Sequence, residues 1–295
     1  MQAFELKNKQ QTRLQQINKG TFKGVMVVKL LMIGNSFCYY YVKELYGMAR
    51  AVGIDMEVCN VYYSGCSLKQ HWTWLEEGAA NYEFFVTNEN GRHKEKPCDL
   101  NHCLEAREWD VISLQSASTL YQYEKEDTIK NGEPYVGNLY QYIRERFPNA
   151  RYLWHHTWIS QLGYRHATDP NNVVLDVATQ KHRAENAAYF ANYACEKYQV
   201  DEVPSGLAWQ LARADERIGD TLCNRVNSEG VDNTDNHHDG NVGGGRYLNA
   251  CVWFEVLTGL SCLGNTYMPD YELDVDKMRI LQQIAHEAVA KCIKK

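Results

Sequence analysis

The chain has 295 residues, of which 44% are hydrophobic and 23% are charged, and its formal net charge at pH 7 is -6. This length predicts one large α/β domain or two small ones with a substantial buried core. The acidic balance lacks the basic footprint with which proteins bind nucleic acid or anionic lipid, so we expect neither partner.

The N-terminal residues and the cysteines bear on domain organisation and on the cellular compartment that we expect. Residues 1–24 are polar and predict a loosely packed N-terminal extension, whereas residues 25–295 predict a single domain. The extension lacks the apolar core of a signal peptide, so we expect a cytoplasmic protein, or a secreted one if a leader has been removed. The 10 cysteines show no CxxC pair, which favours free thiols in a reducing compartment.

The first predicted element is an apolar run over residues 27–33, which stops at Gly34, Asn35 and Ser36 and is followed by helical spacing from 40 to 52. This pattern predicts a strand, a tight turn and a helix. Open α/β sheets bind ligands at such strand ends, and the amides that begin the helix can hold a developing oxyanion. The turn resembles the Gly-Asp-Ser block of the SGNH (GDSL-like) hydrolase superfamily, and in particular an uncharacterised subgroup with a Gly-Asn-Ser-Phe block.

A second strand, over residues 56–62, ends in a loop that contains Gly65. The resemblance implies that the amides of Ser36 and Gly65 donate to the oxyanion, because a glycine lets the backbone approach the substrate closely. An ordinary turn glycine is the alternative interpretation. By its position in the same turn as Ser36, Asn35 is assigned to substrate binding.

A short helix over residues 71–78 and a hairpin near 82–97, which we interpret as an insertion, precede a helix over 100–107 and a strand over 110–115. The superfamily places an asparagine amide at the end of this strand in the oxyanion hole. This chain has Gln115 there, which carries the same donor one methylene further out. The alternative is that Gln115 only caps the strand.

A helix over residues 135–147 leads to a strand over 150–154, which ends in His155, His156 and, shortly after, Trp158. We expect these three side chains to line the pocket and to bind substrate hydroxyls. A helix over 180–198, a strand over 200–204 and a helix over 206–218 continue the alternation. The alternation predicts a three-layer α/β/α fold with a flavodoxin-like parallel sheet of about five strands.

The polar segment 231–240 precedes an apolar helix that begins near 245, and an amphipathic helix over 275–293 ends the chain. Within the segment, Asp235 and His238 have the Asp-x-x-His spacing by which the superfamily supplies its triad acid and base. The resemblance therefore implies a triad of Ser36, His238 and Asp235, in which imidazole takes the serine proton near neutral pH. His237, assigned to substrate binding, remains an alternative base.

Other interpretations of this segment stay open. Asp232 or Asp239 could be the acid, and the acidic and amide side chains could bind calcium, although the spacing is not that of an EF-hand. We expect no metal and no cofactor. The hypothesis is a serine esterase that acts on a small ester, with an acylated carbohydrate as the substrate that the resemblance implies. The alternative is a carbohydrate-binding protein without catalytic activity.

Overall fold

The apolar runs of the sequence form the strands of one seven-stranded sheet in the computed structural model, which describes residues 27–165, 173–227, 229–232 and 237–293. The predicted N-terminal extension and Asp235 lie outside the described residues. The strands are β1 (Val27–Gly34), β2 (Asp55–Tyr62), β3 (Glu83–Asn88), β4 (Gly91–Lys94), β5 (Val111–Leu114), β6 (Arg151–His155) and β7 (Asp201–Val203).

The spatial order of the strands is β4-β3-β2-β1-β5-β6-β7. The run from β2 through β1, β5 and β6 to β7 is parallel and has the flavodoxin-like order. This parallel run has about the predicted number of strands, but the whole sheet has seven, because the hairpin of β3 and β4 pairs antiparallel with β2 and extends the same sheet. Its alternating apolar residues, including Phe84 and Val86, are buried, and this burial holds the hairpin in the sheet.

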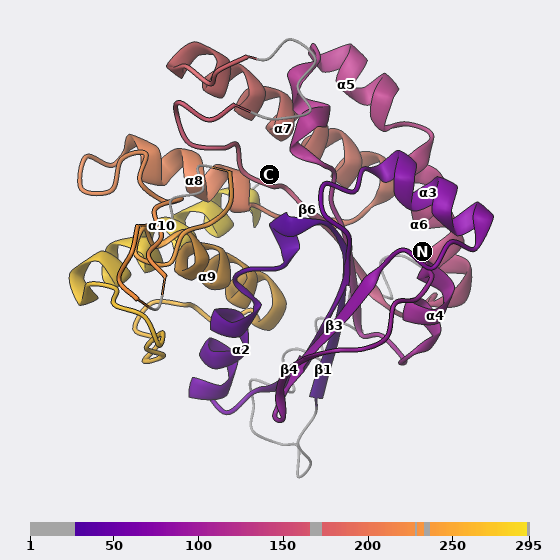
Figure 1. Cartoon of the computed structure of the whole chain (residues 1–295), viewed down its shortest axis with the longest axis horizontal. Coiled ribbons are helices and arrows are strands. Elements are labelled where there is room, and N and C mark those ends of the chain that lie inside the picture. The colour runs from indigo at the N-terminus through magenta and orange to yellow at the C-terminus, as the bar shows by residue number, and fades with distance from the viewer. Residues whose placement is uncertain (1–26, 166–172, 228, 233–236, 294–295) are drawn as a thin grey trace.

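Two layers of helices cover the sheet, as predicted. Figure 1 shows α2, α8, α9 and α10 on one face and α3 to α7 on the other. The side chains of β1 alternate between two apolar cores, with Leu30 and Met32 on the first face and Leu31 and Ile33 on the second. The helices are α2 (Val42–Ala51), α3 (Leu68–Glu77), α4 (Leu100–Glu105), α5 (Lys125–Gly132), α6 (Tyr135–Arg146), α7 (Val177–Tyr198), α8 (Ser205–Ala214), α9 (Gly245–Thr258) and α10 (Val275–Ile293), with the 3-10 turns η1 (Ser36–Cys38) and η2 (Ser118–Gln122).

Helix α9 is the element that carries the polar segment 237–244 onto the sheet. It is buried along nearly its whole length and packs against α2, α8 and α10. The segment therefore leads directly into the core rather than into a mobile surface element. Among the described residues, none of the helices combines the length and the apolar composition that crossing a membrane requires.

Candidate active site

Ser36 occupies a tight turn at the carboxyl end of β1, the middle strand of the seven-stranded sheet. The turn is one short 3-10 helix, and the Asn35 side chain caps it by accepting a hydrogen bond from the Phe37 amide at 3.1 Å. The backbone amide of Cys38 donates to the Asn35 carbonyl at 3.1 Å. Ser36 is 4% exposed. The sequence therefore places a serine hydroxyl at the edge of the sheet where this fold class binds its ligands.

Asn35 joins three segments of the site. Its Nδ2 donates to the Cys66 carbonyl at 3.0 Å, in the loop after β2. Its Oδ1 accepts a second hydrogen bond from Nε2 of Gln115 at 2.7 Å, at the end of β5. A carboxylate could not make the first of these bonds, because it has no hydrogen to donate. This side chain therefore contacts the backbone or side chains of the two segments that also carry Gly65 and Gln115.

The Gln115 side chain lies directly against Gly34. A Cβ atom at position 34 would stand 2.6 Å from Cδ of Gln115, so the glycine is required by this close approach. Because Nε2 of Gln115 donates to Asn35, its Oε1 accepts from Nδ1 of His155, at 2.9 Å. Gln115 is 1% exposed, and one hydrogen of its amide remains for a further acceptor.

His155 lies beneath Gln115. Its Nε2 accepts from the Ser205 hydroxyl at 3.1 Å, so both ring nitrogens have partners. Burial, with a smaller contribution from neighbouring His156, lowers the pKa of His155 to about 3. The ring is therefore neutral throughout the physiological range. This geometry favours a role in holding Gln115 over direct contact with a substrate.

The other two residues predicted after β6 take different places. His156 pairs with Glu202 at 2.8 Å and lines a separate cavity of about 290 Å³ between α7 and α8. Trp158 is fully buried, stacks on Trp209 at a centroid distance of 4.8 Å and meets the edge of Phe37 at 4.6 Å. Trp158 thus supports the serine turn from within the core, and its ring is not presented to solvent.

The histidine segment, residues 237 and 238, packs against the serine turn. Phe37, the neighbour of Ser36, contacts both imidazoles, with ring centroids 4.9 Å from His237 and 6.4 Å from His238. His238 also packs on the Tyr40 ring at 4.9 Å. The structure therefore brings two imidazoles from the far end of the sequence against Phe37, the neighbour of Ser36.

His237 is held from its other side as well. Its Nδ1 makes a hydrogen bond of 2.7 Å with the Ser160 hydroxyl, and its ring stacks on Tyr164 at 4.9 Å. The residue is 9% exposed. Ser160 and Tyr164 belong to the loop that follows β6, and their contacts fix the plane of the His237 ring.

The two alternative acids differ in environment. Asp239 is fully buried, and this burial raises the pKa of its carboxyl to about 6, against the opposing effect of the nearby Arg246 guanidinium. Its Oδ2 accepts from Nδ2 of Asn249 at 3.3 Å, whereas its Oδ1 has no hydrogen-bond partner among the described residues. Asp232 is exposed and pairs with Val226 in an isolated bridge.

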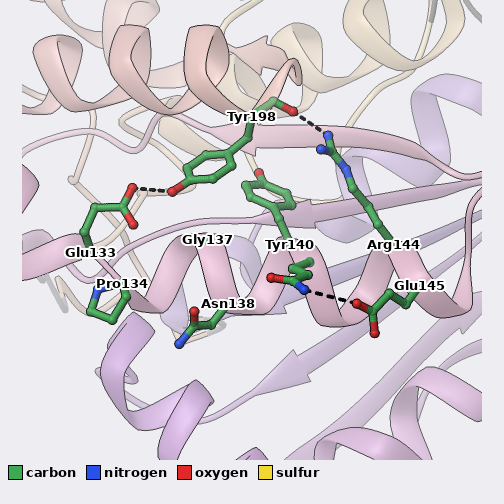
Figure 2. A pocket seen from close by; sticks show the side chains of 9 residues that line it. Glu133, Pro134, Gly137, Asn138, Tyr140, Arg144, Glu145 and Tyr198 are labelled. Carbon is green, nitrogen blue, oxygen red and sulfur yellow. Dashed lines mark hydrogen bonds between the residues drawn. The ribbon is translucent and has the colours of Figure 1, made fainter. Parts of the chain in front are cut away.

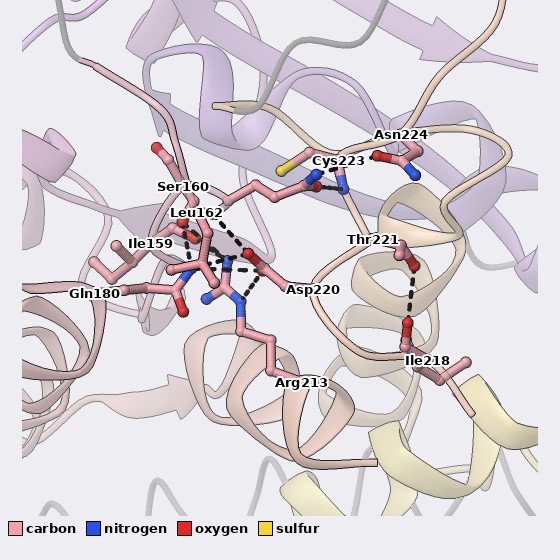
Figure 3. Close-up of polar contacts among 11 residues, drawn as sticks. Ile159, Ser160, Leu162, Gln180, Arg213, Ile218, Asp220, Thr221, Cys223 and Asn224 are labelled. Carbon is pink, nitrogen blue, oxygen red and sulfur yellow. Dashed lines mark hydrogen bonds and ion pairs between the residues drawn. The ribbon is translucent and has the colours of Figure 1, made fainter. Parts of the chain in front are cut away.

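A polar network fixes the loop that carries Ser160 (Figure 3). Arg213 pairs with Asp220 at 2.6 Å, and its Nη2 donates to the Ser160 carbonyl at 3.1 Å. The same carbonyl accepts from Nε2 of Gln180 at 2.9 Å, and Asp220 accepts from the Leu162 amide at 2.6 Å. No sequence pattern predicted a role for these residues. Through Ser160 they determine where His237 lies.

A family model described as a domain of unknown function (DUF4886) matches residues 29–288. The chain belongs to the DUF4886 family. A crystal structure of a DUF4886 family protein from Bacteroides uniformis is 28% identical to it, with a TM-score of 0.74, and the match covers 90% of this chain and 95% of that chain.

At low identity, the DUF4886 chain is also structurally similar to esterases and other hydrolases. LAE5, an alpha/beta hydrolase enzyme from the metagenome of Lake Arreo in Spain, is 12% identical with a TM-score of 0.47, and the match covers 80% of this chain and 98% of that chain. The acetyl xylan esterase AlAXEase is 12% identical with a TM-score of 0.44, and the match covers 78% and 100% of the two chains. No curated protein matches the chain.

Two cavities of this DUF4886 chain differ in their relation to the site. The smaller, of about 160 Å³, is bounded by Ser67 and Lys69 from the loop and helix after Gly65, and by Ser116 and Thr119 after Gln115. The larger, of about 570 Å³, lies along α6 (Figure 2), and the lining of neither cavity includes a predicted site residue. Among the described residues, no group of three or more His, Cys, Asp or Glu side chains could hold a metal ion.

Proposed function

We propose that this DUF4886 chain is a serine esterase that acts on a small ester, with Ser36 as nucleophile, His238 as base and Asp235 as acid. The observation that carries the proposal is the packing of the histidine segment on Phe37, the residue next to Ser36. A serine hydroxyl at the carboxyl end of a central parallel strand, with imidazole beside it, is the arrangement that nucleophilic acyl transfer requires.

In the proposed reaction, Oγ of Ser36 attacks the ester carbonyl carbon while the imidazole takes the hydroxyl proton. The carbon–oxygen bond to the alcohol then breaks, and the imidazolium gives its proton to the leaving oxygen. A water molecule, deprotonated by the same imidazole, hydrolyses the acyl-enzyme and releases the acid. The acid partner of the triad orients the imidazole and stabilises its charged form.

The proposed oxyanion hole consists of the backbone amides of Ser36 and Gly65 and the remaining amide hydrogen of Gln115. Asn35 accepts the other hydrogen of Gln115, at 2.7 Å, and holds the loop that follows Gly65 through the Cys66 carbonyl. Gly65 has a φ of +67°, which a residue with a side chain rarely adopts. Donors held in advance stabilise the charge that develops on the carbonyl oxygen without reorganising during the reaction.

We assign the substrate to the class of small esters, including acylated carbohydrates. The cavity of about 160 Å³ is lined in part by Ser67 and Ser116, which closely follow Gly65 and Gln115 in the chain, and its volume suits a short acyl group or a hydroxylated fragment. Half-buried tyrosines Tyr39, Tyr40 and Tyr62 contact one another next to the serine turn. Such rings offer both apolar faces and hydroxyl groups to a substrate.

Labelling with a fluorophosphonate tests the proposal, because this probe reacts with an activated serine and not with an ordinary hydroxyl. The wild-type protein should be labelled at Ser36 and should hydrolyse a short-chain aryl ester, and Ser36→Ala should lose both activities. Ser261→Ala, which removes an exposed hydroxyl beyond the end of α9, is the matched control and should retain both.

The same experiment separates catalysis from the alternative of carbohydrate binding without turnover. A wild-type protein that is not labelled but binds an acetylated oligosaccharide in calorimetry would support the binding function. Equal ester turnover by folded Ser36→Ala would exclude Ser36 as the nucleophile. Replacing His238 and His237 by alanine, one at a time, then identifies the base, because only loss of the base should abolish labelling of an otherwise intact Ser36.

A further inference from the structure

Cys98 and Cys103 form a close pair of thiols outside the candidate active site. Both are free cysteines, and their Sγ atoms lie 3.0 Å apart. Cys98 immediately precedes Asp99, which caps α4 by accepting from the His102 amide at 2.8 Å. Cys103 lies in the next turn of the helix. The two residues thus occupy the positions before the cap and four residues after it, where apolar side chains commonly pack together as a hydrophobic staple.

The backbone on both sides of this pair is fixed. Cys98 exchanges two hydrogen bonds with Tyr82, at 3.2 and 3.1 Å, just before β3 begins. The Asp99 cap fixes the first turn of α4. A hydrophobic staple needs only apolar contact, whereas here the two sulfurs face each other at about 1 Å more than the length of a disulfide bond. A small rotation of the two side chains is therefore sufficient to join them.

The two thiols are not equivalent. Cys98 is 6% exposed and follows the exposed Lys96 and Pro97, whereas Cys103 is fully buried. When Cys98 is a thiolate, Cys103 donates a hydrogen bond to its sulfur, and this bond lowers the pKa of Cys98. That hydrogen bond and burial raise the pKa of Cys103. A thiol of lowered pKa that lies beside an exposed segment and next to a resolving thiol resembles the arrangement of redox-sensitive cysteine pairs.

We propose that Cys98 and Cys103 form a reversible disulfide when a peroxide oxidises Cys98. The Cys98 thiolate attacks one oxygen of hydrogen peroxide, the O–O bond breaks, and the departing hydroxide takes a proton and leaves as water. This step gives a sulfenic acid on Cys98. The Cys103 sulfur then attacks the Cys98 sulfur, the S–O bond breaks, and a second water leaves with the proton of Cys103. The two thiols supply the two electrons that reduce one peroxide to two waters.

The bond links two parts of the second face of the sheet. It joins the first turn of α4 to the segment that pairs with Tyr82, and Tyr82 is hydrogen-bonded through its hydroxyl to His71 on α3 at 2.9 Å. Oxidation therefore ties α4 more firmly to the edge hairpin. The disulfide includes no residue of the proposed triad, so this proposal is independent of the esterase function.

Peptide mapping of the full chain provides the test. Cleavage after Lys94 and Arg107 releases residues 95–107, which contain Cys98 and Cys103 and no other cysteine, while Pro97 protects the bond after Lys96. The protein is treated with hydrogen peroxide, alkylated with iodoacetamide under denaturing conditions and digested with trypsin. We expect this peptide to be two hydrogens lighter and unalkylated, and to accept two alkyl groups once it has been reduced first.

Three variants assign the roles. Cys103→Ser should stop at the sulfenic acid, which dimedone traps on Cys98, whereas Cys98→Ser should leave Cys103 unmodified. Cys59→Ser, which removes a buried thiol on β2, is the matched control and should form the disulfide as the wild type does. A wild-type peptide 95–107 that carries two alkyl groups after peroxide treatment overturns the proposal. So does oxidation of Cys98 only to sulfinic acid, or a bridge from Cys98 to another cysteine.

Discussion

Asn35 connects the serine turn to the two other segments of the site with a single side chain. Its amide nitrogen donates to the Cys66 carbonyl, and its amide oxygen accepts from Phe37 and Gln115. The side chain is almost completely buried, so water cannot replace a hydrogen bond that is lost here. Each lost bond would leave a buried polar group without a partner. The amide is therefore matched to its surroundings in a way that the isosteric carboxylate is not.

The first prediction concerns this match. Asn35→Asp should lower the free energy of unfolding by about 1–3 kcal/mol, because the donor to the Cys66 carbonyl is lost and an oxygen faces that carbonyl instead. Urea denaturation at pH 7 measures the change. Asn101→Asp is the matched control, since Asn101 accepts from the Tyr142 hydroxyl and a carboxylate can do the same. Equal losses in the two variants would contradict the argument.

A second prediction separates the role of Gln115 in the structure, as a partner of Asn35 and His155, from its proposed role as an oxyanion donor. Gln115→Ala should lower kcat by about a hundredfold, or ~3 kcal/mol, with little change in KM, because its donor strengthens only as charge develops on the substrate. It should also lower the melting temperature, since Asn35 and His155 lose a partner. Kinetics on the folded protein and a melting curve measure the two effects.

Ser205→Ala is the control for Gln115. Ser205 donates to Nε2 of His155, on the side of the ring opposite Gln115, and so has no direct contact with Gln115 through this bond. Its loss should reduce stability and leave kcat within about threefold of the wild type. If Gln115→Ala behaves as Ser205→Ala does, with a lower melting temperature and an unchanged kcat, Gln115 is a structural strand cap and not an oxyanion donor.

At the scale of elements, the loop after β6 matters as much as the strands. The Arg213 guanidinium on α8 and the Asp220 carboxylate are both largely buried, and together they bind the backbone of residues 160 and 162. Ser160, held in this way, fixes His237. A helix and two loops that are distant in the sequence therefore determine the position of one imidazole.

The third prediction tests this support. Arg213→Ala should destabilise the fold by about 3 kcal/mol or more, because it leaves the Asp220 carboxylate without its counter-charge, and should lower ester turnover in the protein that remains folded. Arg217→Ala is the matched control, since Arg217 is exposed and pairs with Asp215 at the surface, and it should change neither property appreciably. Thermal melts and turnover by both variants decide the matter.

The elements that the sequence predicted are those with a local signal. The apolar runs of β1, β2, β5 and β6 and the turn at Gly34 lie close to their predicted positions, because each depends on neighbours in the chain. Helix α5 and the turn η2 were not predicted. In α5 only Thr128 and Gly132 are buried, so its sequence carries no apolar stripe from which to recognise it.

The residues after β6 show where sequence reasoning reaches its limit. His155 and His156 were both predicted to face the pocket, yet consecutive residues of extended chain point to opposite sides. His155 lies under Gln115 and His156 between α7 and α8. The alternation of side chains along a strand predicts that His155 and His156 point in opposite directions. Which side faces the site depends on the packing of distant helices, and the sequence does not show this packing locally.

At the scale of the whole molecule, burial of ionisable groups on both faces of the sheet makes folding sensitive to pH. Burial lowers the pKa of His71 and His155 to about 3. Their contribution to stability is present above the ordinary histidine pKa and declines as the pH falls from about 6.5 towards 3, because only the unfolded chain then takes up the protons. Burial acts in the opposite sense on Glu44 and Asp239, whose carboxyl pKa values it raises to about 7 and about 6.

The last prediction isolates Glu44. It lies in the first turn of α2, its Oε2 has no hydrogen-bond partner among the described residues, and Arg246, Asp239 and Tyr271 surround it. Because its folded pKa is raised, the stability that it contributes is present below about pH 4.5 and is lost as the pH rises through about 7. Glu44→Gln does not titrate, so the wild type should lose about 3 kcal/mol relative to this variant between pH 4 and 8.

Urea denaturation of both proteins across this range measures the difference, and the exposed Glu76→Gln on α3 is the matched control. Its stability curve should run parallel to that of the wild type, because a carboxylate in water has nearly the same proton affinity in the folded and unfolded chains. A Glu44→Gln curve that is also parallel to the wild type would mean that Glu44 ionises in the fold without cost. In that case a charged partner must reach it, and Arg246, whose guanidinium lowers the pKa of Glu44 against the effect of burial, is the residue to replace next.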